Sequence, residues 1–174
     1  MATPAHALDR IASAPPGAHT KYLNFGRERS GLIVTPAAGT SIANGIQFTT
    51  ANDAETRDPV LVAIYGTNDP ITSPDNGFGN NENWTLIVDN LVYDAPLARY
   101  TPGPITMFGN ETPWTSYKIV VLENRGPDAP TAPGNGNSIQ FAEVQLFSGV
   151  PEPSTMGLAL AAIFGLAMRL RRRA

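Results

Sequence analysis

Cysteine is absent from the 174 residues of the chain. Disulfide bonds, thiolate catalysis and zinc sites built on cysteine are therefore excluded. Histidine is nearly absent as well: the chain holds only His6 and His19, and neither lies near a nucleophile motif. Histidine and cysteine are the side chains most often used in acid–base and nucleophilic catalysis. Their scarcity favours a protein that is not an enzyme.

Positive charge is scarce in most of the chain. Four of the 12 basic residues lie at positions 169–173, and one of the 15 acidic residues is Glu152. Residues 1–149 therefore carry eight basic and 14 acidic residues, a formal net charge of −6. Nucleic-acid-binding domains are typically basic, so this balance argues against a nucleic-acid partner.

Long apolar runs are missing until the C-terminus, where three short segments follow one another. A polar motif at 150–155 comes first, then an apolar run from Met156 to Met168, then a basic end. A helix of 13 residues spans only about 20 Å, which is short of a hydrocarbon core of roughly 30 Å. The run is apolar on all sides, unlike the one-sided pattern of a buried helix in a small domain, which is the alternative. We therefore predict a marginal membrane helix at 156–168.

These three segments resemble the PEP-CTERM sorting signal. The motif residues are Val150, Pro151, Glu152, Pro153 and Ser154, and the basic stop consists of Arg169, Arg171, Arg172 and Arg173. The resemblance implies a bacterial envelope protein that is a substrate of the membrane enzyme exosortase and is processed near the Pro-Glu-Pro motif. It also implies an inner-membrane anchor with a periplasmic body, followed by release to the cell surface or medium. The arginines would stay cytoplasmic.

The N-terminus lacks both a basic segment and an apolar segment, so no signal peptide is visible. A sorting signal requires export, and we therefore expect an export signal upstream of Met1.

The body, residues 1–149, shows no helical period between positions 20 and 149. Short runs rich in β-branched and aromatic residues alternate there with Gly, Pro, Asn and Asp clusters, which is typical of a β-sandwich. The run 60–65 is apolar on both faces and so predicts a central strand, and 117–122 is similar. We predict strands at 31–35, 45–50, 60–66, 84–88, 105–108, 117–122 and 139–147.

The last predicted strand changes its phase. Ile139 and Phe141 share one alternation, whereas Val144 and Leu146 share the other. A period of two cannot shift without an extra residue, so we predict a bulge near Ala142 that re-aims the following glutamate.

The body also resembles the galactose-binding-like, or discoidin (coagulation factor 5/8 C-domain), family. The matching segments follow the family's order at 7–9, 21–25, 59–68, 83–85, 117–121 and 139–146. The resemblance implies an eight-stranded jelly roll that binds carbohydrate through one rim of loops. It also places the start of this chain inside the first family segment, so we expect the N-terminus of the body to be truncated.

Many members of that family hold a structural calcium ion, and the positions matching its ligands are Asp9, Thr20 and Glu143. Calcium prefers six to eight oxygen ligands, which carboxylates and loop carbonyls supply. Two features depart from the family: Arg10 replaces the usual glycine, and the insert 11–19 is long. The alternative is that Glu143 forms a salt bridge with one of Arg27, Arg29 and Lys118.

A sugar site would need aromatic faces and planar hydrogen-bonding groups at a loop rim. We expect Trp84 to belong to the core, whereas the sequence determines the location of Trp114 less clearly. The candidates for this rim are Phe78, Trp84, Tyr93, Arg99, Tyr100 and Trp114.

Two functional classes follow from the sequence. One is a non-catalytic envelope protein that binds glycan or exopolysaccharide, or forms part of the matrix. The other is a hydrolase that uses loop carboxylates.

Overall fold

The computed structural model describes residues 4–10, 21–26, 30–74, 79–126 and 138–149. These residues form β-strands joined by loops, with two short 3₁₀ helices. The helices are η1 (Pro4–Ala7) and η2 (Glu55–Arg57). The strands are β1 (Tyr22–Asn24), β2 (Ser30–Val34), β3 (Gly45–Thr49), β4 (Pro59–Thr67), β5 (Thr85–Val92), β6 (Thr106–Met107), β7 (Ser116–Asn124), β8 (Ile139–Phe141) and β9 (Glu143–Phe147).

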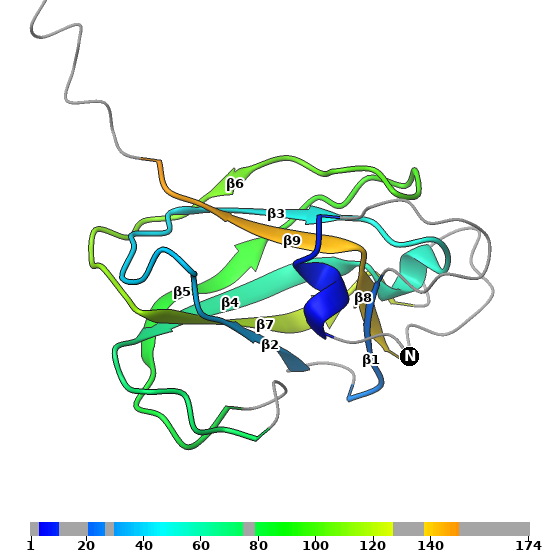
Figure 1. Cartoon of the computed structure of the whole chain (residues 1–174). Coiled ribbons are helices and arrows are strands. Elements are labelled where there is room, and N and C mark those ends of the chain that lie inside the picture. The colour runs from blue at the N-terminus through cyan, green and yellow to red at the C-terminus, as the bar shows by residue number, and fades with distance from the viewer. Residues whose placement is uncertain (1–3, 11–20, 27–29, 75–78, 127–137, 150–174) are drawn as a thin grey trace, which may run out of the picture.

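The strands form three antiparallel groups arranged in two layers. One layer is the four-stranded sheet β2-β7-β4-β5, and the other contains the three-stranded sheet β6-β3-β9 (Figure 1). The pair β1-β8 lies at one end of the molecule. An all-β sandwich is therefore confirmed as the architecture of the described residues.

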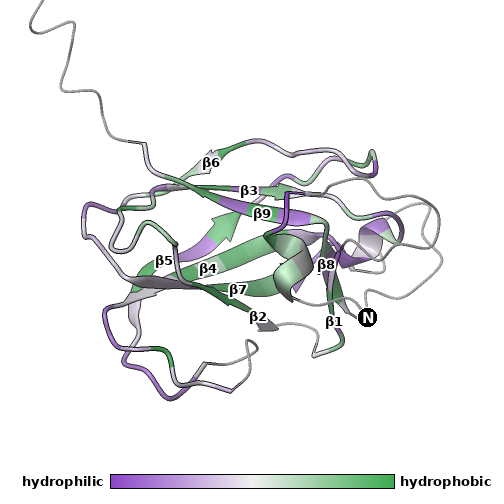
Figure 2. Ribbon diagram, in the orientation of Figure 1, coloured by the Kyte–Doolittle hydropathy of each residue, from purple (hydrophilic) through white to green (hydrophobic). Residues whose placement is uncertain are grey.

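The core forms between the layers because β4 and β7 each carry a continuous apolar run, at 60–64 and 119–122 (Figure 2). In their antiparallel register Val62 lies opposite Val121 and Ile64 opposite Ile119, and all four side chains are fully buried. The prediction that 60–66 and 117–122 are central strands is confirmed, since β7 and β4 are the two inner strands of their sheet.

The irregularity predicted near Ala142 has a larger effect than a bulge. The strand ends there: β8 pairs with β1, whereas β9 pairs with β3 in another sheet. The Ala142 N–H donates to the Thr49 carbonyl at 2.8 Å, which holds the crossing point. Phe141, just before the crossing, stacks on Tyr22 with ring centres 4.9 Å apart. The phase shift in the sequence thus marks a change of sheet.

The predicted membrane helix at 156–168 and the basic residues after it lie outside the described residues. Within the described ranges, no helix is long and apolar enough to span a bilayer.

Candidate functional site

The end of the sandwich that holds Gly149, the last described residue, carries two adjoining cavities. Strand β3 begins at Gly45, opposite Met107 at the end of β6 and Phe147 at the end of β9. The loops 35–44 and 108–115 therefore meet there with residues 148 and 149. We call this region the exit pole.

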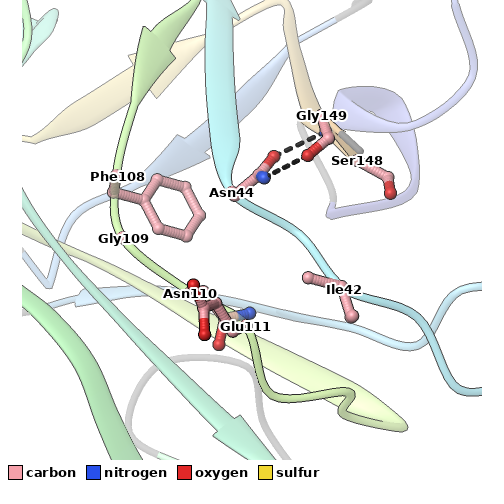
Figure 3. Close-up of a pocket in the computed structure, with 8 residues that line it drawn as sticks. All are labelled: Ile42, Asn44, Phe108, Gly109, Asn110, Glu111, Ser148 and Gly149. Atoms are coloured by element: carbon pink, nitrogen blue, oxygen red, sulfur yellow. Dashed lines mark hydrogen bonds between the residues drawn. The ribbon is translucent and has the colours of Figure 1, made fainter. Parts of the chain in front are cut away.

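The two cavities share the residues of the turn 109–111 in their linings. One has a volume of about 420 Å³ and opens beside Gly149 (Figure 3). The other has a volume of about 430 Å³ and opens beside the start of β5. The first is lined by Ile42, Asn44, Phe108, Gly109, Asn110, Glu111, Ser148 and Gly149. The second is lined by Thr85, Leu86, Ile87, Gly109, Asn110, Glu111, Thr112 and Trp114.

Hydrogen bonds fix the turn that the two cavities share. The Phe108 N–H donates to the Asn44 carbonyl at 2.8 Å, and the Asn110 amide donates to the Ala43 carbonyl at 2.9 Å. The Asn110 side-chain oxygen accepts the N–H of Thr112 at 3.1 Å. The Asn110 side chain therefore attaches the turn that carries the exposed Glu111 to residue 43 and closes it on residue 112.

Glu111 is the carboxylate of this site. Its side chain is exposed and forms no hydrogen bond or ion pair with the described part of the chain. Figure 3 shows it at the edge of the first cavity, across from Asn44 and Gly149. Its oxygens are therefore available to accept hydrogen bonds from a ligand.

Trp114 forms one wall of the second cavity. A Cβ atom added to Gly66 would lie 2.4–2.6 Å from three atoms of the indole, so the ring rests directly on the β4 backbone. Its indole nitrogen is buried and has no hydrogen-bond partner among the described residues. Ser41 and Trp114 also exchange backbone hydrogen bonds of 3.0 and 2.9 Å. Trp114 thus packs against the core and still lines the cavity.

Gly149, the last residue that the structure describes, makes a two-point contact with Asn44. The Asn44 amide donates to the Gly149 carbonyl at 2.5 Å, and the Gly149 N–H donates to the Asn44 side-chain oxygen at 2.6 Å (Figure 3). Comparison with family models matches residues 149–173 to the PEP-CTERM protein-sorting motif, so the match begins at this restrained glycine. The chain ends in a PEP-CTERM sorting motif.

The PEP-CTERM match supports the prediction that the protein is an exosortase substrate sorted to the cell envelope. Its residues from Val150 onward lie outside the described part of the structure. No curated protein matches the sequence.

The predicted calcium ligands are only partly described. Asp9 is exposed and follows η1, which contacts β9; Glu143, the first residue of β9, is 3% exposed. Thr20 lies outside the described residues. Within those residues, no three His, Asp or Glu side chains group closely enough to hold a metal ion. Calcium binding by two carboxylates and a threonine stays a prediction.

Lys118, one of the partners considered for Glu143, lies over two aromatic rings. Its ammonium lies 4.7 Å from the ring centre of Trp84 and 5.1 Å from that of Tyr65. Burial lowers its pKa, and the nearby Glu82 opposes that shift. Trp84 itself is half-buried and donates to the Gly79 carbonyl at 2.5 Å. The expectation that Trp84 belongs to the core is therefore wrong: it fastens the loop before β5.

The other aromatic and basic candidates for a sugar site are dispersed. The Tyr93 hydroxyl is buried between Phe48 and Pro104. Arg99 pairs with the buried Asp58, and Tyr100 lies in the same loop, after β5. Phe78 lies outside the described residues. Among the predicted residues that the structure describes, Trp114 is the one that lines either of the two cavities. Asn44, Asn110 and Glu111 were not predicted as site residues, and the Asn-Glu-Thr turn before Trp114 was the available signal in the sequence.

Proposed function

We propose that this PEP-CTERM protein is a non-catalytic component of the bacterial envelope whose sandwich binds glycan, such as exopolysaccharide, at the exit pole. The observation that carries the proposal is the pair of cavities that share Asn110 and Glu111. Volumes of about 420 and 430 Å³ fall in the usual range for small-ligand sites.

The cavity linings have the chemistry that a sugar needs. Sugar hydroxyls require donors and acceptors, which the side chains of Asn110, Glu111 and Thr112 can supply. The apolar faces of a sugar ring pack on apolar or aromatic surfaces, and Ile42 and Trp114 contribute such surface. The jelly-roll topology and the relationship to discoidin domains belong to the same proposal, because that family binds carbohydrate through loops.

A binding role is better supported than hydrolysis. Most glycoside hydrolases use two carboxyl groups that flank the scissile bond. Glu111 is the single carboxylate among the described residues that line either cavity. Nothing in that lining favours the alternative of a hydrolase over a binding protein.

The cellular course that we propose follows from the tail. The apolar segment 156–168 anchors the protein in the inner membrane with Arg169, Arg171, Arg172 and Arg173 on the cytoplasmic side. Exosortase then engages the Pro-Glu-Pro motif, and the body reaches the cell surface or medium. A calcium ion held by Asp9, Thr20 and Glu143 would stabilise the body.

Glycan binding can be tested with full-length protein in detergent on an array of bacterial polysaccharides, with and without calcium. We expect Glu111→Gln to weaken binding about tenfold or more, since hydrogen bonds to charged groups are the stronger ones. Glu123→Ala, at an exposed position of β7 outside both cavities, should bind like the wild type. Equal binding by Glu111→Gln and the wild type would show that glycan does not bind at the exit pole. If no glycan binds at all, the proposed class of ligand is wrong.

A further inference from the structure

Asn44 joins three parts of the exit pole. Its backbone N–H donates to the Phe147 carbonyl at 2.9 Å, and its carbonyl accepts the Phe108 N–H. Its side chain then continues the contact to Gly149 through two further hydrogen bonds. The last register pair between β3 and β9 is Gly45 with Phe147. The Asn44 side chain therefore extends the attachment of the chain two residues beyond the sheet.

The chemistry of this attachment suits an asparagine and a glycine. A side-chain amide carries both a donor and an acceptor, whereas a carboxylate only accepts and an alanine does neither. A Cβ atom at position 149 would lie 3.0 Å from the Asn44 oxygen and 3.2 Å from the Met107 methyl carbon. Glycine permits the close approach that both hydrogen bonds need.

The attachment limits how far the sorting motif reaches from the body. Pro151 is two residues after Gly149, and Glu152 is three. Even a fully extended chain covers about 3.3–3.6 Å per residue, so Glu152 stays within about 11 Å of the attachment. An enzyme that grips an extended segment needs room on both sides of it. Release of residues 148 and 149 would move the last attached residue among those that the structure describes back to Phe147 and add about 7 Å of reach.

We propose that Asn44 is a positioning residue for processing of the PEP-CTERM motif: its amide restrains Gly149 on the body, and exosortase acts on molecules in which this restraint is open. The inference rests on the sorting step of the proposed function and not on glycan binding. Local opening of this kind is an equilibrium, and the rate of processing then follows the open fraction.

The experiment measures release of the body from membranes by pulse–chase immunoblot in an exosortase-positive host that expresses the full chain with a working export signal. Three variants are compared with the wild type: Asn44→Ala, a six-residue Gly-Ser insertion between Gly149 and Val150, and both together. Asn52→Ala, at an exposed position in the loop after β3, is the matched control. Each hydrogen bond shifts such an equilibrium roughly two- to tenfold, and Asn44→Ala removes two, so we expect it to speed release about tenfold or more.

The insertion should speed release by a similar factor, and Asn44→Ala should add nothing to it, because the added residues already supply the reach. A merely structural role would give a different pattern, since destabilisation of the body would act equally with and without the insertion. Asn44→Asp keeps the acceptor but sets a carboxylate against the Gly149 carbonyl, and it should behave like Asn44→Ala.

Release of the insertion variant at the wild-type rate would overturn the proposal, even if Asn44→Ala were degraded. Unchanged or slower release of a folded Asn44→Ala would overturn it as well. If no exosortase-dependent release occurs in any variant, the sorting step itself fails, and the proposal fails with it. That result would not bear on glycan binding, which the array experiment tests independently.

Discussion

Arg99 holds Asp58 with two parallel hydrogen bonds: one guanidinium nitrogen lies 3.0 Å from Oδ1 and the other 2.6 Å from Oδ2. Asp58 is fully buried just after η2, and burial raises its pKa while Arg99 and Arg125 oppose that shift. The second cation is more distant, because Arg125 lies 3.9 Å from the carboxylate. The pair therefore ties the loop after β5 to the loop before β4, at the end of the sandwich opposite the exit pole.

Removal of Arg99 should strongly destabilise the body. Arg99→Ala leaves a buried carboxylate with one distant cation, and breaking a buried pair in this way costs about 3–5 kcal/mol. Urea unfolding followed by circular dichroism measures the change, with Glu123→Ala as an exposed control. A loss below about 1 kcal/mol would mean that water or Arg125 compensates Asp58 more fully than the geometry indicates.

Gly66→Ala should disturb Trp114. The added methyl group would lie 2.4–2.6 Å from the indole, so the ring or the strand must move. We expect a loss of about 1–3 kcal/mol and a change in tryptophan fluorescence. Gly109→Ala is the matched control, since a Cβ atom there meets nothing within 4 Å. Equal stability of the two variants would contradict the packing of Trp114 on β4.

The loop before β5 should lose stability in acid. Hydrogen bonds from Ser73 and Thr72 lower the pKa of Glu82 from its ordinary value of 4.5 to about 2. A carboxylate whose pKa falls on folding stabilises the native state above its ordinary pKa, and it loses this effect as the pH drops toward the lowered value. The melting temperature of the wild type should therefore exceed that of Glu82→Gln above pH 4.5 and converge with it near pH 2. A constant difference across this range would contradict the assignment.

Calcium should raise the melting temperature of the body if Glu143 is a ligand. An ion that binds only the native state stabilises it increasingly as its free concentration rises. Thermal unfolding in chelator and in millimolar calcium measures the shift, and Glu143→Gln should abolish it. Identical melting temperatures in both conditions would show that the folded body does not bind calcium.

Sequence reasoning located the strands because their signals are local. The runs that became β4 and β7 are apolar on both faces, and only an inner strand covered on both sides suits that pattern. The phase change at Ala142 marked the correct position, but a local pattern does not reveal that the two halves join different sheets. The strand β1 was not predicted, since three residues are too few for an alternation to emerge.

The exit pole was harder to predict than the fold. Asn44 and Gly149 are 105 residues apart, and their contact depends on β3 pairing with β9. Asn44 and Asn110 each stand among turn residues that look like ordinary loop composition. By contrast, the sorting motif is contiguous, so its three segments were recognisable without any tertiary structure.

If exosortase processes this chain at its PEP-CTERM motif, Glu152→Ala should block the release of the body. Glu152 carries the only charge between Glu143 and Arg169, which makes it the natural contact for a basic pocket in the enzyme. The assay is an immunoblot of membrane and medium fractions from an exosortase-positive host that exports the full chain. We predict that Glu152→Ala remains anchored in the membrane while the wild-type body is released. Equal release of the two proteins would show that the motif is only a linker and would contradict the account.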